Sequence, residues 1–120
     1  MRAKSVTFQS TSGVYLTTKL FPKLGIADVL AAKTNDAGPP AVANGDVEIA
    51  IQPVSELVHA PGIDYVGPIP DDIQFVSVFS AAIVAGSTQV DASRRLVSFL
   101  ASAAADAAIR NAGMQRATRR

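Results

Sequence analysis

The sequence predicts an α/β fold, and three observations point to it. Residues 47–51 are apolar except for Glu48 and lie between the turn residues 44–46 and a polar stretch that starts at Gln52, which is typical of a strand. Residues 5–9 alternate polar and apolar side chains and lead into a helical pattern, as a strand followed by a helix does. From Gln89 onward, apolar residues recur at helical spacing.

The composition indicates one folded domain. The chain has 120 residues, of which 48% are hydrophobic and 18% charged, so it holds enough apolar side chains for a core and too many for a disordered segment. Its formal net charge of +1 gives no basic footprint for nucleic acid. It has no cysteine, which excludes disulfides, thiolate metal ligands and thiol nucleophiles.

The ends of the chain show no targeting signal. The basic start, residues 1–4, has no apolar stretch of signal-peptide length behind it, and no apolar run is long enough to span a bilayer. Four arginines lie near the other end: Arg110, Arg116, Arg119 and Arg120. We expect them to form a solvated tail rather than a binding patch.

In the first half of the chain, residues 5–9 are predicted as a strand with Val6 and Phe8 on one face and Thr7 on the other. A polar turn follows, and then a helix that begins near Ser12 or Gly13 behind residues of helix-capping type. That helix is predicted to end at Pro22 and Gly25. A helical piece over residues 26–32 follows, then a loop over 35–40 and one or two helical turns over 40–43.

In the second half, residues 47–51 are predicted as a strand, residues 55–58 as a short helix and residues 63–66 as another strand. Residues 75–84 are the longest strand candidate, and apolar side chains on both faces indicate a strand that is covered on both sides. The helix from Gln89 is expected to break near residues 101–103 and to continue through Ile109 to a cap at Gly113.

The start of the first helix is a candidate binding site. Its unpaired backbone N–H groups and the positive end of its dipole suit an oxyanion, and Ser10, Thr11 and Ser12 add hydroxyl donors beside Gly13. The alternative is that these residues only cap the helix, a common role for serine and threonine.

No other residues form a catalytic or metal-binding constellation. His59 is the single histidine and lacks a nearby carboxylate at the spacing of a triad or metal site. Asp71 and Asp72 are neighbours after a proline, where a turn or helix cap is the expected role. Tyr15 and Tyr65 are expected to pack with their hydroxyls at the surface. The sequence therefore predicts no catalytic residue, no metal, no cofactor and no enzyme activity.

Five segments in order resemble one protein family. They are residues 12–16 with 24–27, residues 44–52, residues 66–70, residues 99–100 and residues 111–113. These segments are similar to the second lobe of molybdate-type solute-binding proteins of ABC transporters. The resemblance implies the type II periplasmic-binding fold, in which a small anion or polar solute lies between two lobes, and this chain corresponds to the second lobe only.

The resemblance implies a three-layer α/β/α lobe over residues 1–84, then C-terminal helices over residues 85–113 that would pack on a first lobe, and a basic tail over residues 114–120. It also implies a periplasmic parent protein that works with an ABC permease. The resemblance also implies a tyrosine that donates to the ligand at the position just past the strand over residues 47–51. This chain has Gln52 there instead. An amide both donates and accepts, so it selects an anion less cleanly, and ordinary loop polarity is the other reading of Gln52.

The sequence thus predicts recognition of a small oxyanion or polar solute, without chemistry, by Ser10, Thr11, Ser12, Gly13 and Gln52. With one lobe, the chain is expected to bind the solute weakly or not at all. The apolar stripe of the terminal helices lacks a host, so we expect homo-oligomers. The rival function is a stand-alone effector-sensing or interaction module of the same fold.

Overall fold

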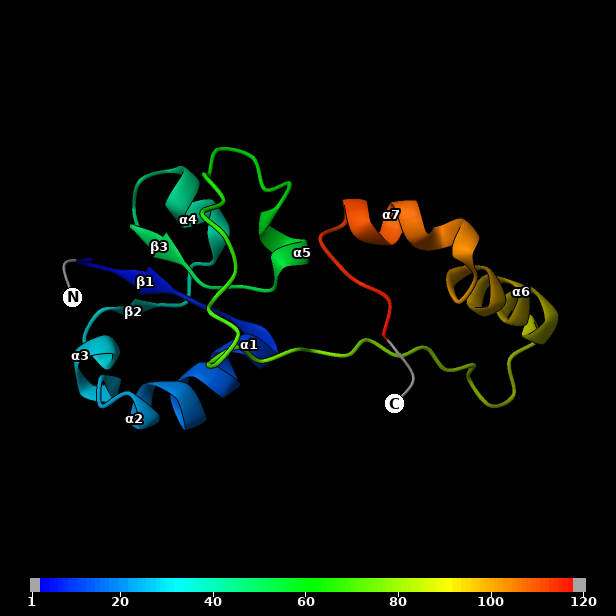
Figure 1. The fold of residues 1–120 in the computed structure, drawn as a ribbon, viewed down its shortest axis with the longest axis horizontal. Coiled ribbons are helices and arrows are strands. Elements are labelled where there is room, and N and C mark those ends of the chain that lie inside the picture. The colour runs from blue at the N-terminus through cyan, green and yellow to red at the C-terminus, as the bar shows by residue number, and fades with distance from the viewer. Residues whose placement is uncertain (1–2, 118–120) are drawn as a thin grey trace. The chain divides into compact units, whose positions relative to one another are not determined.

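A computed structural model describes residues 3–117. These residues divide into two compact units, one that ends at Phe75 and one that starts at Val76. The first unit carries the sheet and the second carries the C-terminal helices (Figure 1). No helix in this part of the chain is long and apolar enough to cross a bilayer.

The first unit is built on a three-stranded parallel sheet of strand order β2-β1-β3. The strands are short: β1 (Val6–Thr7), β2 (Thr34–Asn35) and β3 (Ile49–Ala50). Val6 lies opposite Thr34 on one side and Ile49 on the other. The predicted α/β fold is confirmed, although the strands predicted over residues 5–9 and 47–51 are reduced to two paired residues each.

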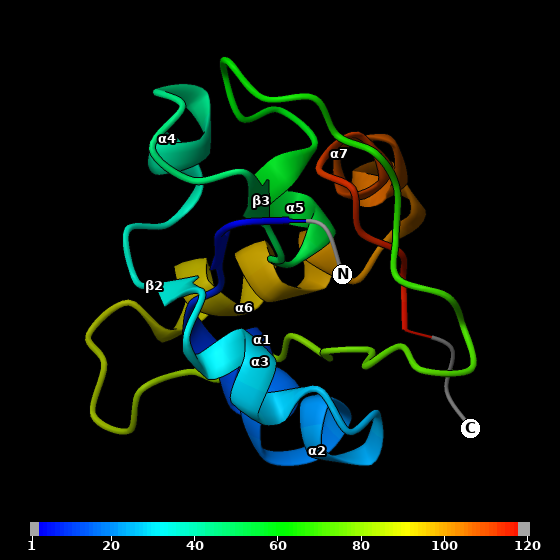
Figure 2. The same ribbon diagram turned by 90° about the vertical axis from the view of Figure 1, so that its left-hand side faces the viewer.

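Helices cover both faces of this sheet. One long helical segment contains α1 (Ser10–Tyr15), the π-helical η1 (Leu16–Leu20) and α2 (Phe21–Lys23). It lies with α3 (Ala27–Ala31) below the strands, and the other face carries α4 (Pro39–Ala43) and α5 (Val54–Leu57) (Figures 1 and 2). This arrangement is a three-layer α/β/α unit, and the short helices predicted over residues 26–32, 40–43 and 55–58 are all present.

The core lies between the sheet and the long helical segment. Its buried residues are Val6, Phe8, Leu16, Leu20, Phe21 and Leu30. The rings of Phe8 and Phe21 meet edge to face with 5.6 Å between their centroids, a favoured geometry for aromatic pairs. The π-helical turn holds Leu16 and Leu20 on the buried side, so the register of this helix is fixed by its apolar side chains.

Thr7 is the polar residue of β1, predicted to lie on the other face of the strand from Val6 and Phe8. It is fully buried, because β1 is the central strand and has helices on both sides. Its hydroxyl oxygen accepts a hydrogen bond from the Gly38 N–H at 2.9 Å. Gly38 has φ +72°, a backbone conformation that favours glycine, and a Cβ there would lie 2.8 Å from Oε1 of Gln9.

Two predicted strands are absent from the described structure. Residues 63–66 have no regular structure, and residues 75–84 form a drawn-out segment that pairs with none of the three strands (Figure 1). The side chains of residues 76–84 are largely exposed rather than covered. The apolar pattern there is real, but a strand also needs a neighbouring strand for its backbone groups, and the described part of the chain supplies none.

The second unit contains α6 (Val90–Leu100), the 3₁₀ turn η2 (Ala103–Ala105) and α7 (Asp106–Asn111). The predicted helix from Gln89, the break after it and the second helix are confirmed. Gly113 has φ +72°, and the Met114 N–H donates to the carbonyl of Ile109 at 3.1 Å. Glycine therefore ends this helix as predicted.

Arg116 corrects the expectation of a freely solvated basic tail. Its guanidinium forms an ion pair with Asp106 and donates to the carbonyls of Ala101 and Ser102 at the end of α6. Its Nε lies 3.0 Å from Oδ1 of Asp106. Arginine at a helix C-terminus satisfies carbonyls that the helix leaves free. Arg119 and Arg120 lie outside the described residues.

Replacing Leu16 by alanine tests the core of the first unit. Leu16 is only 1% exposed, so Leu16→Ala should lower the free energy of unfolding by about 2–5 kcal/mol. Val14→Ala is the control, because Val14 lies in the same helix and is 63% exposed, and its effect should stay near about 0.5 kcal/mol. Urea unfolding followed by circular dichroism measures both. Equal losses in the two variants would contradict the assigned core.

Candidate functional site

The candidate site lies where the parallel strands end. At its carboxyl end, β1 runs through Gln9 into α1, and the neighbouring strand β3 runs through Ile51 to Gln52. The helices that follow the two strands lie on opposite faces of the sheet (Figure 1). Two adjacent strands whose connections diverge in this way leave a crevice at their carboxyl ends, where ligands of open α/β sheets bind.

Two of the predicted site residues, Ser12 and Gln52, meet at this edge. The Ser12 hydroxyl donates to the Gln9 carbonyl at 2.8 Å and lies 3.4 Å from Oε1 of Gln52. A serine hydroxyl has one proton, and the nearer Gln9 oxygen takes it. Ser12 is therefore firmly held, whereas the amide of Gln52 is held weakly. We call this place the Ser12–Gln52 corner, formed by Gln52 and the first turn of α1, residues 10–13.

Gln52 is buried but incompletely hydrogen-bonded. Its residue exposure is 8%, and its Nε2 atom has no hydrogen-bond partner within the described structure. Turning the amide by 180° would let Nε2 donate to the Ser12 hydroxyl, but Oε1 would then be the unpartnered atom. In either orientation one buried polar atom is unsatisfied, which costs roughly 1–3 kcal/mol. A buried polar atom without a partner in a native structure calls for an explanation, and contact with a ligand at the strand ends is one.

The other predicted residues open α1. The Gly13 N–H already donates to the Gln9 carbonyl at 3.1 Å, so it is not one of the free N–H groups at the start of the helix, and the part of Gly13 in binding stays a prediction. Its α-carbon packs close to Phe8, where a Cβ would lie 3.3 Å from the ring. The helix provides no partner for the N–H groups of Ser10, Thr11 and Ser12. The side chains of Ser10 and Thr11 lie outside the described part of the structure.

Gln9 fixes the loop beside the corner, a role that the sequence pattern did not reveal. Its Nε2 donates to the Asp36 carbonyl at 2.6 Å, and its Oε1 lies against Gly38. The loop after β2 is thereby tied to the start of α1. The signal in the sequence was the glycine followed by two prolines at residues 38–40, which marks a turn of fixed shape.

Tyr15 also differs from its expected role. Its hydroxyl donates to the Ile73 carbonyl at 2.9 Å, and its ring stacks on Phe75 with 5.0 Å between centroids. The hydroxyl is therefore not a surface group, and α1 holds the last residues of the first unit. Tyr65 remains partly exposed at 38%.

Two hollows of the first unit lie away from the corner. One groove of about 170 Å³ is apolar and lies between α4 and the loop after α5; it is lined by Pro39, Pro40, Ala43, Asn44, Ala60 and Pro61. Another of about 200 Å³ runs over the long helical segment and is lined by Phe8, Thr17, Phe21, Ala27, Asp28, Ala31 and Thr34. Neither of these two hollows is lined by Gln52.

The sequence predicted no catalytic or metal-binding role for one histidine and two neighbouring aspartates. His59, Asp71 and Asp72 are exposed. Among the residues that the structure describes, no group of three or more histidine or carboxylate side chains could hold a metal ion. The corner consequently holds backbone N–H groups, a hydroxyl and an amide, all of them uncharged.

Comparison with known proteins assigns the chain to a family. Residues 5–115 match the bacterial extracellular solute-binding proteins. The chain belongs to this family. Its members bind solutes, so the predicted recognition of a small solute is supported, and the family is typically extracellular or periplasmic. This match does not confirm molybdate as the solute.

One relative corrects the functional prediction. The chain is 40% identical over 119 residues to an aconitate isomerase from Pseudomonas sp., a match that covers 95% of this chain and 45% of the relative. The chain thus spans about half the length of the relative. The prediction of no enzyme activity is contradicted, because this relative is named as an enzyme. No solved structure matches the chain.

Replacing Gln52 by methionine tests whether its amide is retained at a cost in stability. Gln52→Met keeps the length of the side chain and removes the unsatisfied polar atom, so the free energy of unfolding should stay the same or rise by up to about 2 kcal/mol. Gln115→Met, at an exposed position, should change it by no more than about 0.5 kcal/mol. A clear loss of stability in Gln52→Met alone would mean that the amide is a structural partner. Urea unfolding measures both variants.

Proposed function

We propose that the Ser12–Gln52 corner binds one carboxylate of a small organic anion. The unsatisfied amide of the buried Gln52 carries this proposal. Beside it, the first turn of α1 has N–H groups that need acceptors, and the positive end of the helix dipole favours an anion there. A carboxylate oxygen accepts hydrogen bonds from all of these donors.

The uncharged corner limits what it does to the ligand. A hydroxyl and an amide neither gain nor lose a proton near neutral pH, so the corner orients its ligand and does not act as an acid or base. A ligand with several carboxylates would need cationic side chains outside the corner to balance its remaining charge. The corner accordingly supplies one part of a larger site.

The relative suggests the class of ligand. Aconitate is an unsaturated tricarboxylate, and a protein that isomerises it must hold the carboxylates while the geometry about the carbon–carbon double bond changes. We propose that this chain contributes the binding corner to a protein that binds such polycarboxylates and isomerises them. The 40% identity over 95% of the chain supports the ligand class more directly than the reaction, because the corner holds no group that gains or loses a proton near neutral pH.

A second candidate is solute capture for an ABC permease, in the periplasm and without chemistry. The match of residues 5–115 to the solute-binding family favours it. The two candidates share the corner and differ in the fate of the ligand. Proton NMR of the olefinic signal of aconitate distinguishes them in a protein that contains the complete site, since an isomerase converts one isomer into the other and a carrier returns it unchanged.

Titration of the chain with trans-aconitate tests the corner itself. The amide signals of residues 10–12 and the side-chain amide of Gln52 should shift in ¹⁵N-labelled protein, with a Kd of about 1 mM or weaker because only part of the site is present. Gln52→Met should weaken binding several-fold, whereas Gln115→Met should not. Shifts confined to the second unit would contradict the site. Micromolar binding by this chain would contradict the partial-site interpretation.

A further inference from the structure

The single proton of the Ser12 hydroxyl decides how the neighbouring amide can bond. The hydroxyl lies 2.8 Å from the Gln9 carbonyl and 3.4 Å from Oε1 of Gln52, so its proton goes to Gln9. The lone pairs of the Ser12 oxygen remain, and these can only accept a hydrogen bond. The side of Ser12 that faces Gln52 is therefore an acceptor.

The two orientations of the Gln52 amide satisfy different numbers of polar groups. With Oε1 towards Ser12, two oxygens face each other with no proton between them, and both N–H bonds of the buried Nε2 lack an acceptor. With the amide turned by 180°, Nε2 donates to the Ser12 oxygen, and one acceptor is left without a partner. The turned orientation consequently satisfies more of the amide.

Burial limits where a ligand can meet this amide. Gln52 is 8% exposed, and other residues of this chain already enclose its side-chain atom on the inner side, away from Ser12. Ser12 itself is partly exposed. A ligand at the strand ends therefore approaches the amide from the Ser12 side, where the turned orientation places Nε2.

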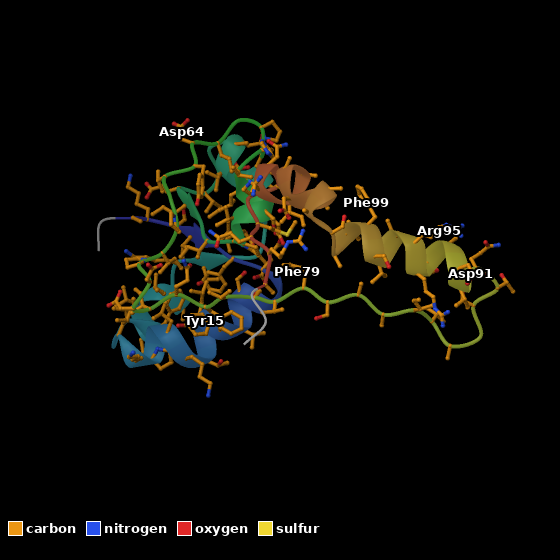
Figure 3. All side chains as sticks on the ribbon, turned by 45° about the vertical axis from the view of Figure 1, so that its right-hand side comes forward. Tyr15, Asp64, Phe79, Asp91, Arg95 and Phe99 are labelled. Carbon is orange, nitrogen blue, oxygen red and sulfur yellow. The ribbon has the colours of Figure 1, made fainter. Side chains whose placement is uncertain are left out.

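The helix holds Ser12 in place, so the amide is the group that adjusts. One turn further along, the Tyr15 hydroxyl donates to the Ile73 carbonyl at 2.9 Å, and its ring stacks on Phe75. Figure 3 labels Tyr15 on this helical segment. The neighbouring Leu16 is 1% exposed in the core. The Ser12 oxygen is thus a fixed acceptor against which a movable amide can be oriented.

We propose that Ser12 is a positioning residue that turns the Gln52 amide into a donor. In this arrangement Nε2 gives one proton to the Ser12 oxygen and the other to the ligand. The hydrogen bonds then run in one direction, from Gln52 to Ser12 and from Ser12 to the Gln9 carbonyl, and bonds in such a chain strengthen one another. The inference rests on the proposed carboxylate site.

The consequence is specificity for an ionised carboxylate. An isolated amide can donate or accept, whereas an amide held by Ser12 offers the ligand only a proton. The free N–H groups in the first turn of α1 are donors as well. A carboxylate accepts from all of them, but the N–H bonds of a carboxamide or the O–H of a protonated acid would face further donors. Ser12 therefore excludes such neutral ligands without contacting them through its own proton.

The orientation is tested first in the unchanged chain, by NMR of ¹⁵N-labelled protein. The side-chain amide signals of Gln52 are those that disappear in Gln52→Met. With Nε2 towards Ser12, these amide protons should show a nuclear Overhauser effect to the β protons of Ser12. Amide protons that show no such effect to Ser12 would overturn the inference.

Three variants then test whether Ser12 sets the orientation. Ser12→Ala should move an amide proton signal of Gln52 upfield, because its acceptor is lost, and Ser12→Thr should restore the signal because it keeps the hydroxyl. Thr18→Ala is the matched control, since the Thr18 hydroxyl also bonds a carbonyl of the same helical segment, that of Val14 at 2.7 Å. Signals that stay in place in Ser12→Ala, or that Thr18→Ala moves as far, would contradict the role of Ser12.

Titration with acetate and acetamide at constant ionic strength tests the specificity. The two probes have the same shape, and the chain should prefer acetate. Ser12→Ala should reduce this preference several-fold, because the freed amide can then turn Oε1 to accept from acetamide, and Ser12→Thr should restore it. An unchanged preference in Ser12→Ala would overturn the inference and leave the carboxylate site standing. If neither acetate nor trans-aconitate shifts the corner, the proposed function fails, and the amide measurements without ligand still decide the role of Ser12.

Discussion

The burial of β1, which has a neighbouring strand on each side, is the constraint on which the first unit depends. Only two residues of each strand take part, so the sheet is held together less by its ladder than by the side chains around it. Val6, Thr7 and Phe8 are all buried. Two of them face apolar helices, and Thr7 holds the loop after β2 through Gly38. This loop, tied also to Gln9, lies beside the Ser12–Gln52 corner.

The location of the corner could be predicted from the sequence, but its hydrogen bonding could not. A strand that ends just before Gln52 and a helix that starts near Ser12 bring the two residues to one sheet edge. The local sequence pattern does not reveal that the Ser12 hydroxyl and the Gly13 N–H both donate to the Gln9 carbonyl. Those details depend on the packing of three strands and two loops.

The errors in the predicted fold have the same origin. Strand β2 is a threonine followed by an asparagine, with no apolar alternation to reveal it, and it exists because it pairs with β1. Residues 76–84 have the pattern of a strand but pair with no strand among the described residues. Arg116 lies in a basic segment that reads as a solvated tail, but its guanidinium donates to carbonyls at the end of α6. In each case pairing or capping between distant residues outweighs local propensity.

The long helical segment joins the site to the rest of the first unit. Ser12 lies at the corner, Leu16 and Leu20 anchor the next turns in the core, and Tyr15 holds the chain at Phe75. A ligand that pulled on the first turn of α1 would therefore act against the buried leucines, which cost several kcal/mol to displace. The first turn is thus preorganised by packing, while the weakly held amide of Gln52 remains the adjustable group. For the proposed carboxylate site, this means that a rigid helix start lies beside one amide that can turn to meet its ligand.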